Sequence, residues 1–275
     1  MANFTIADIK ALRDQLGTGM VDTKKALEEA DGDVEKAVEI LRLKGAKGNA
    51  KRADRSTSEG LVAAREVNGK VTIIELACET DFVAKNDRFI ALADKVVDAA
   101  AAVSADSVDA ALAAPVGSQT VEQVIADEAA IIGEKVELRR VRTLSGEQFE
   151  VYLHKTSKDL PPQVGVVLAY SGDDAETARS IAQHISFANP SYLSRDEVPA
   201  ADVEKERDIV TEISRQEGKP DAALPKIVEG RVNAFFKQVS LLDQDYAKDN
   251  KTSVAQVAKD AGLTLTGFAR FKVGA

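Results

Sequence analysis

Apolar residues recur at helical spacing along the N-terminal stretch, and two breaks divide this stretch into three short segments. The first predicted helix begins after Thr5, a good N-cap, and its stripe comprises Ile6, Ile9, Leu12 and Leu16. Gly17-Thr18-Gly19-Met20 interrupts the pattern, and the second helix is expected to begin at Asp22 or Thr23. We therefore predict a three-helix bundle over residues 1–45, which is near the lower size limit for an independent core.

Strand-like runs follow the bundle. Leu61–Val67 and Lys70–Cys78 flank Asn68-Gly69, the strongest short sequence signal for a β-hairpin. Asn86 is a natural N-cap for the long amphipathic helix expected after it. These residues predict a hairpin that leads into a helix.

A second strand pair is predicted at Val136–Val141 and Phe149–Tyr152. A further strand at Val164–Tyr170 precedes a helix that ends before Asn189-Pro190. The succession of hairpins and helices predicts an α+β fold whose core consists of two similar halves, each an antiparallel sheet packed by helices.

The C-terminal part begins with an amphipathic pattern typical of an antiparallel helical hairpin. The stripe of its second helix comprises Leu224, Ile227, Val228, Val232, Phe235, Phe236 and Val239, and Pro225 lies in the first turn, where proline is tolerated. Leu263–Val273 is the predicted last strand. The predicted organisation is a bundle (1–45), a basic, glycine-bearing linker (46–59), two core halves (60–143 and 144–199), a helical hairpin (200–240) and a return to the core with a short C-terminal module (241–275).

Composition narrows the possible functions. The chain has 275 residues, is 44% hydrophobic and carries a formal net charge of −9. Such a negative charge disfavours direct nucleic-acid binding as the main function. The sequence contains no signal peptide and no apolar run long enough to cross a membrane, so no membrane association is expected. A single cysteine fits a reducing, cytoplasmic environment.

Few residues offer catalytic or metal chemistry. The sequence lacks the glycine-rich phosphate loop of nucleotide-binding proteins, and two histidines with one cysteine do not suggest a metal site. Cys78 is expected to be a buried, inert thiol, and His184 a packed or capping residue. We therefore expect no catalytic residues, metal or cofactor.

The stretch from Glu75 to Asn86 is organised differently, because a buried-looking strand passes into a helix through Thr80-Asp81-Phe82-Val83. Composition alone favours packing of Phe82 into its own core, and exposure for burial elsewhere is the alternative. The run Glu75–Lys85 resembles the signature of the elongation factor Ts family, the exchange factors that release GDP from elongation factor Tu. Ala77 departs from it, because the family usually has Asn there.

Further segments resemble the same family. Residues 12–27 are similar to its first signature and depart from it at Leu16, Thr18 and Thr23. Ile181–Ile185, Asn189–Leu193 and Val228–Arg231 match segments at the same relative places. The resemblance spans nearly the whole chain, and its length and C-terminus look most like actinobacterial members.

The resemblance implies a guanine-nucleotide exchange factor, not an enzyme, with an N-terminal bundle like that of ubiquitin-associated (UBA) domains. Its partner would be elongation factor Tu in the GDP-bound and nucleotide-free forms. The implied contacts near the partner's Mg²⁺ site are Thr80, Asp81, Phe82 and Val83. The implied contacts of the bundle are Arg13, Met20 and Val21, with His154 as a weaker contact.

Two other classes of function remain open at this point. The chain could be an adaptor that uses its N-terminal bundle, or an enzyme that uses Cys78. Self-association through the helical hairpin also remains possible, because that amphipathic hairpin must bury its apolar face somewhere.

Overall fold

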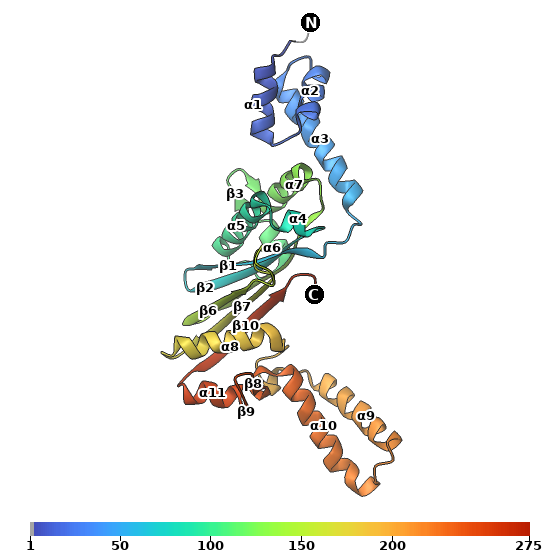
Figure 1. Cartoon of the computed structure of the whole chain (residues 1–275), viewed down its shortest axis with the longest axis vertical. Coiled ribbons are helices and arrows are strands. Elements are labelled where there is room, and N and C mark those ends of the chain that lie inside the picture. Colours follow the sequence, from blue (N-terminus) through green and yellow to red (C-terminus); the bar gives the residue numbers. More distant parts are fainter. Residues whose placement is uncertain (1–2) are drawn as a thin grey trace.

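The computed structural model describes residues 3–275 and is elongated, with an N-terminal helical bundle at one end and a helical hairpin at the other (Figure 1). The bundle consists of α1 (Ile6–Leu16), α2 (Met20–Glu29) and α3 (Val34–Arg52). Thr5 caps α1 as expected. The core of the bundle comprises Ile9, Leu12, Ala26, Leu27, Ala30, Ala37 and Leu41.

Helix α2 begins earlier than the sequence predicts. Met20 is its first residue and Gly19 its N-cap. Thr23 does not cap the helix, because its side chain is buried and its hydroxyl donates to the carbonyl of Gly19 at 2.9 Å. Met20 therefore lies on a helix and not in a loop.

The predicted linker 46–59 is wrong in its first half, because α3 continues to Arg52. Its Ala, Lys and Arg residues are good helix formers, which offsets the cost of the glycines in this segment. Contacts with α7 (Val121–Ile132) also hold this end of α3. The side-chain amide of Asn49 donates to the carbonyl of Ala126 at 2.7 Å. The connection that remains between α3 and the core is short.

The first sheet has the strand order β1-β2-β5 and is antiparallel. Its strands are β1 (Glu59–Val67), β2 (Lys70–Cys78) and β5 (Val136–Ser145). The hairpin at Asn68-Gly69 is confirmed, and both turn residues have positive φ, 51° and 69°. One face of the sheet is covered by α4 (Asp81–Ala84), α5 (Asp87–Ala102), α6 (Val108–Leu112) and α7, and β3 (Pro115–Val116) pairs with β4 (Gln119–Thr120) beside them.

The second sheet repeats this arrangement with the order β10-β7-β6. Its strands are β6 (Gln148–His154), β7 (Val164–Ser171) and β10 (Thr264–Lys272). In each sheet the second strand along the chain is central, and a third strand returns after intervening helices to pair with it. Helices α8 (Ala175–Ala188) and α11 (Val254–Asp260) contribute to its core. The α+β class is confirmed.

The predicted pairing of the second strand pair is wrong. Strand β5 pairs with β2 and strand β6 pairs with β7, so neighbours in sequence belong to different sheets. Alternating apolar residues indicate that a segment is a strand, but they do not say which partner completes its hydrogen bonds.

The two sheets pack face to face between their helices (Figure 1). Val62, Val71 and Ile73 of the first sheet meet Val167 and Phe271 of the second. The side chain of Val62 packs so closely against the backbone of Gly165 that a Cβ atom at Gly165 would collide with it. Both faces of β2 are therefore buried, which explains its continuous apolar run.

The helical hairpin consists of α9 (Ala200–Gln216) and α10 (Leu224–Val239) and has a small core of its own around Val210, Val228 and Val232. The chain returns to the second sheet through β8 (Asp245–Tyr246) and β9 (Asp249–Ser253). Among residues 3–275, no helix combines the length and the apolarity that crossing a bilayer requires.

Candidate functional site

The connection between β2 and α5 is a single helical turn, α4, capped by Thr80. The Thr80 hydroxyl accepts the backbone N–H of Val83 at 3.4 Å, and Asn86 then caps α5, as predicted. Ala84 is buried and Val83 packs partly against the core, whereas Phe82 points outward with 72% of its surface exposed. The expectation from composition that Phe82 joins its own core is wrong, because Val83 and Ala84 occupy the inward side of this turn.

One charged side chain, that of Lys85, lies against the exposed ring. The Lys85 Nζ lies 4.6 Å from the centre of the Phe82 ring, and it also lies 3.7 Å from the Asp81 carboxylate. The tip of this turn thus presents an aromatic face beside a half-exposed carboxylate. The ring and the carboxylate are both accessible to another molecule on this turn.

A carboxylate distant in sequence holds the turn. Glu134 accepts the backbone N–H groups of Glu79 at 3.1 Å and Thr80 at 3.0 Å, and the hydroxyl of Thr80 donates to it at 2.7 Å. In return, the carboxylate of Glu79 accepts the backbone N–H of Lys135 at 2.6 Å. Burial acts to raise the pKa of Glu79, but this hydrogen bond and the nearby Arg55 outweigh it and lower the pKa.

Cys78 lies directly behind the turn and is fully buried. Its thiol donates to the carbonyl of Thr80 at 3.3 Å. Burial, assisted by the negative charge of Glu134, raises the pKa of this thiol to about 12. The thiol is therefore protonated at neutral pH, which argues against the interpretation of Cys78 as a nucleophile.

The bundle presents its predicted contact residues at and near the α1–α2 connection. Val21 is 66% exposed and Met20 39%, while Arg13 is half-exposed and pairs with its neighbour Asp14. The guanidinium of Arg88, in the first turn of α5, lies against Gly17. The α1–α2 connection therefore sits beside the helix that follows the Phe82 turn.

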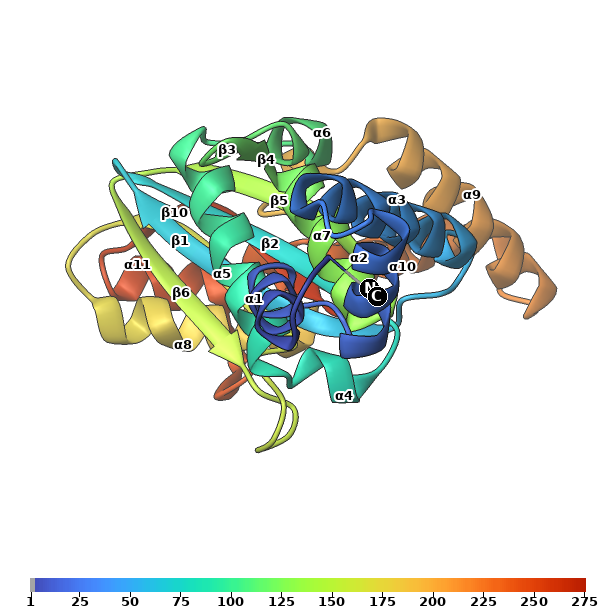
Figure 2. The same cartoon turned by 90° about the horizontal axis from the view of Figure 1, so that it is seen from above.

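His154 ends β6 in the other half of the core. It is exposed, and its Nδ1 lies 2.9 Å from the hydroxyl of Tyr152. Figures 1 and 2 place the loop that follows β6 on the same side of the molecule as α4. The structure thus brings the end of His154's strand and the Phe82 turn to one side, although they belong to different sheets.

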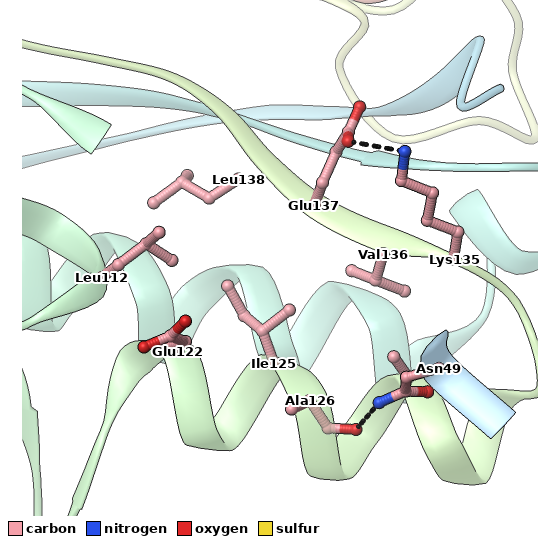
Figure 3. Close-up of a pocket in the computed structure, with 10 residues that line it drawn as sticks. Asn49, Leu112, Glu122, Ile125, Ala126, Lys135, Val136, Glu137 and Leu138 are labelled. Atoms are coloured by element: carbon pink, nitrogen blue, oxygen red, sulfur yellow. Dashed lines mark hydrogen bonds and ion pairs between the residues drawn. The ribbon is translucent and has the colours of Figure 1, made fainter. Parts of the chain in front are cut away.

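A cavity of about 280 Å³ lies between α7 and β5. Figure 3 shows Leu112, Ile125 and Leu138 lining the space between them, whereas Lys135 and Glu137 point away from α7 and pair with each other at 3.1 Å. The walls of this cavity are mainly apolar and bring no set of reactive side chains together. Across residues 3–275, no three or more His, Cys, Asp or Glu side chains are grouped as a metal would require.

Comparison with known proteins identifies relatives that align with the whole length of this chain. A family model described as "Elongation factor TS" matches residues 79–275. Proteins named Elongation factor Ts from Leifsonia xyli and Clavibacter sepedonicus are 73% and 72% identical to this chain, and one from Micrococcus luteus is 56% identical. Each of these alignments covers all of both chains.

Proposed function

Because this chain belongs to the elongation factor Ts family and thus acts in translation elongation, we propose that it is a guanine-nucleotide exchange factor. It binds elongation factor Tu in its GDP-bound form, disturbs the Mg²⁺ and phosphate site, and releases GDP so that GTP can bind. The observation that carries this proposal is the outward position of Phe82, 72% exposed, on a turn fixed from behind. The chain carries out no chemical reaction of its own.

Each residue of the turn has a separate role in this proposal. Phe82 inserts between packed elements of the partner, and its burial is gained only when the partner opens. Asp81 brings a carboxylate to the metal–phosphate cluster, where it competes for or repels charged groups. Thr80 and Val83 hold the ring and the carboxylate outward, because Thr80 caps the turn and Val83 anchors it to the core.

One ring cannot supply the whole effect. Burying a phenylalanine contributes about 1.5–3 kcal/mol, which corresponds to about one to two decades in an equilibrium. Additional contacts must therefore hold the partner, and Arg13, Met20 and Val21 of the bundle supply them, with a smaller contribution from His154. Exchange by this route occurs in the cytoplasm, where elongation takes place.

Thermodynamic linkage relates the binding of nucleotide to elongation factor Tu and the binding of this protein to it. If this protein lowers the affinity of elongation factor Tu for nucleotide, nucleotide lowers the affinity of elongation factor Tu for this protein by the same factor. The tight complex is therefore nucleotide-free, and GTP dissociates it.

The test is the release of a fluorescent GDP from elongation factor Tu, measured with the wild type, Phe82→Ala and Phe187→Ala. Phe187 is the matched control, because it is also exposed, at 66%, but lies on α8. We expect fast release with the wild type and the control, and release at least about tenfold slower with Phe82→Ala. An unchanged rate for Phe82→Ala would refute the role of the ring. Binding without acceleration by the wild type would favour the adaptor function instead.

A further inference from the structure

The Phe82 turn is too short to maintain its own conformation. Helix α4 has four residues, and a single helical turn fixes several backbone angles for very few hydrogen bonds. Its own cap, from Val83 N–H to the Thr80 hydroxyl, is long at 3.4 Å. Groups outside the turn must therefore set the direction in which Phe82 points.

Glu134 provides the outside support from a sharp corner of the chain. Gly133, at φ 83°, ends α7 in the left-handed conformation, and Lys135 leads directly into β5. From this corner one carboxylate oxygen of Glu134 receives the two consecutive N–H groups of Glu79 and Thr80, and the other receives the Thr80 hydroxyl.

The support is reciprocal, because Glu79 accepts the N–H of Lys135 at 2.6 Å. Two corners of the fold, β2 to α4 and α7 to β5, thus hold each other. Helix α7 also carries the N-terminal bundle through the hydrogen bonds of Asn49 and Arg52 to its carbonyls. Glu134 therefore fixes the Phe82 turn to the same helix on which the bundle docks.

We propose that Glu134 is a positioning residue for nucleotide exchange. It holds the backbone of Thr80 so that Phe82 reaches the partner already oriented, together with the bundle. This inference rests on the proposed exchange function. A preorganised contact avoids the entropy cost of ordering the turn at the moment of insertion. The carboxylate itself makes no contact with the partner.

The experiment measures GDP release from elongation factor Tu over a range of concentrations of each variant. The variants are Glu134→Ala, Glu134→Gln, Phe82→Ala and the double variant Glu134→Ala/Phe82→Ala. Glu122→Ala is the control, because Glu122 is an exposed glutamate in the first turn of α7, the helix that ends just before Glu134. Thermal melts and circular dichroism confirm that each variant is folded.

For Glu134→Ala we expect the maximal release rate to fall about tenfold, the effect of losing hydrogen bonds to a charged group, with little change in the half-saturating concentration. Glu134→Gln keeps an acceptor for the two N–H groups and should recover most of the rate. In the Phe82→Ala background, Glu134→Ala should have a much smaller effect than in the wild type, because only the Asp81 carboxylate and no ring remains to be positioned.

A general structural defect would instead multiply with the loss of Phe82. Independent, multiplicative effects of the two substitutions, or an unchanged rate in Glu134→Ala, would overturn the positioning role while leaving the exchange function intact. Failure of the wild type to accelerate release would overturn the exchange function and this inference with it.

Discussion

Substitution of Glu75 is expected to lower the stability of the fold strongly, because the Glu75 carboxylate is fully buried between the two sheets. Arg140 donates to it from Nε at 2.5 Å, Arg139 lies 3.5 Å away, and the backbone N–H of Gly274 donates at 3.2 Å. Arg140 also stacks on the ring of Phe271. Replacing Glu75 by Gln preserves the volume and removes the charge that these groups share.

The expected cost follows from the surroundings of the two arginines. Removing one partner of a buried ion pair typically destabilises a protein by about 3–5 kcal/mol. The side chains of Arg139 and Arg140 are 27% and 32% exposed, so water partly compensates them and the lower end applies. A loss of about 3 kcal/mol corresponds to a fall in Tm of about 6–12 °C for a chain of this size.

Urea denaturation and thermal melts followed by circular dichroism measure this loss, and Glu66→Gln is the control because Glu66 is exposed on β1. Hydrogen exchange at the Gly274 amide should become faster in Glu75→Gln, because its acceptor is weakened. A Glu75→Gln variant that unfolds within about 0.5 kcal/mol of the wild type would refute the argument, since surface substitutions have effects of that size.

Three further predictions concern titratable groups. Burial raises the pKa of Cys78 to about 12, so iodoacetamide at pH 8 should label the thiol of the native protein at least about 100-fold more slowly than that of the unfolded chain. Mass spectrometry measures both labelling rates, and equal rates would contradict the burial of Cys78. Burial lowers the pKa of His184 below 6.5 despite its hydrogen bond to Gln244, so the unfolded chain binds the proton first, and the unfolding free energy should fall below about pH 6.5. Urea titrations at pH 7.5 and 5.5 should show a smaller fall in His184→Gln, and an equal fall would exclude His184 as the cause. Burial acts to raise the pKa of Glu137, but hydrogen bonds led by that from Thr57 lower it to about 2. The ionised Glu137 carboxylate stabilises the folded chain by about 1–2 kcal/mol after solvent screening. This contribution is complete above about pH 4.5 and is lost from there down to about pH 2, so Glu137→Gln should flatten that part of the acid unfolding curve.

Local signals in the sequence predicted the elements well. Asn68-Gly69 fixed the first hairpin, and Thr5 and Asn86 are helix caps in the structure. Each of these signals acts within a few residues, so it does not depend on the rest of the fold. The apolar stripe of α10 predicted its helix for the same reason.

Features that depend on distant partners were not predictable. Glu134 supports Thr80 across 54 positions of sequence, and a glutamate after a glycine gives no local sign of that role. The pairing of β5 with β2 and the continuation of α3 also depend on tertiary neighbours. Within the signature itself, Glu75 is a buried structural residue and Phe82 an exposed one, a distinction that the shared motif does not make.

The order in which the strands occur along the chain has a consequence for synthesis. The first sheet is complete once Ser145 has been made, so it can form while the ribosome is still translating. The second sheet lacks its outer strand until β10, Thr264–Lys272, which follows two helices of the hairpin and α11. Central strand β7, which ends at Ser171, therefore has an unpaired edge for about the last third of translation, and an unpaired edge favours aggregation. A chain cut before Thr264 would keep the Phe82 turn but lack the strand that closes the second sheet.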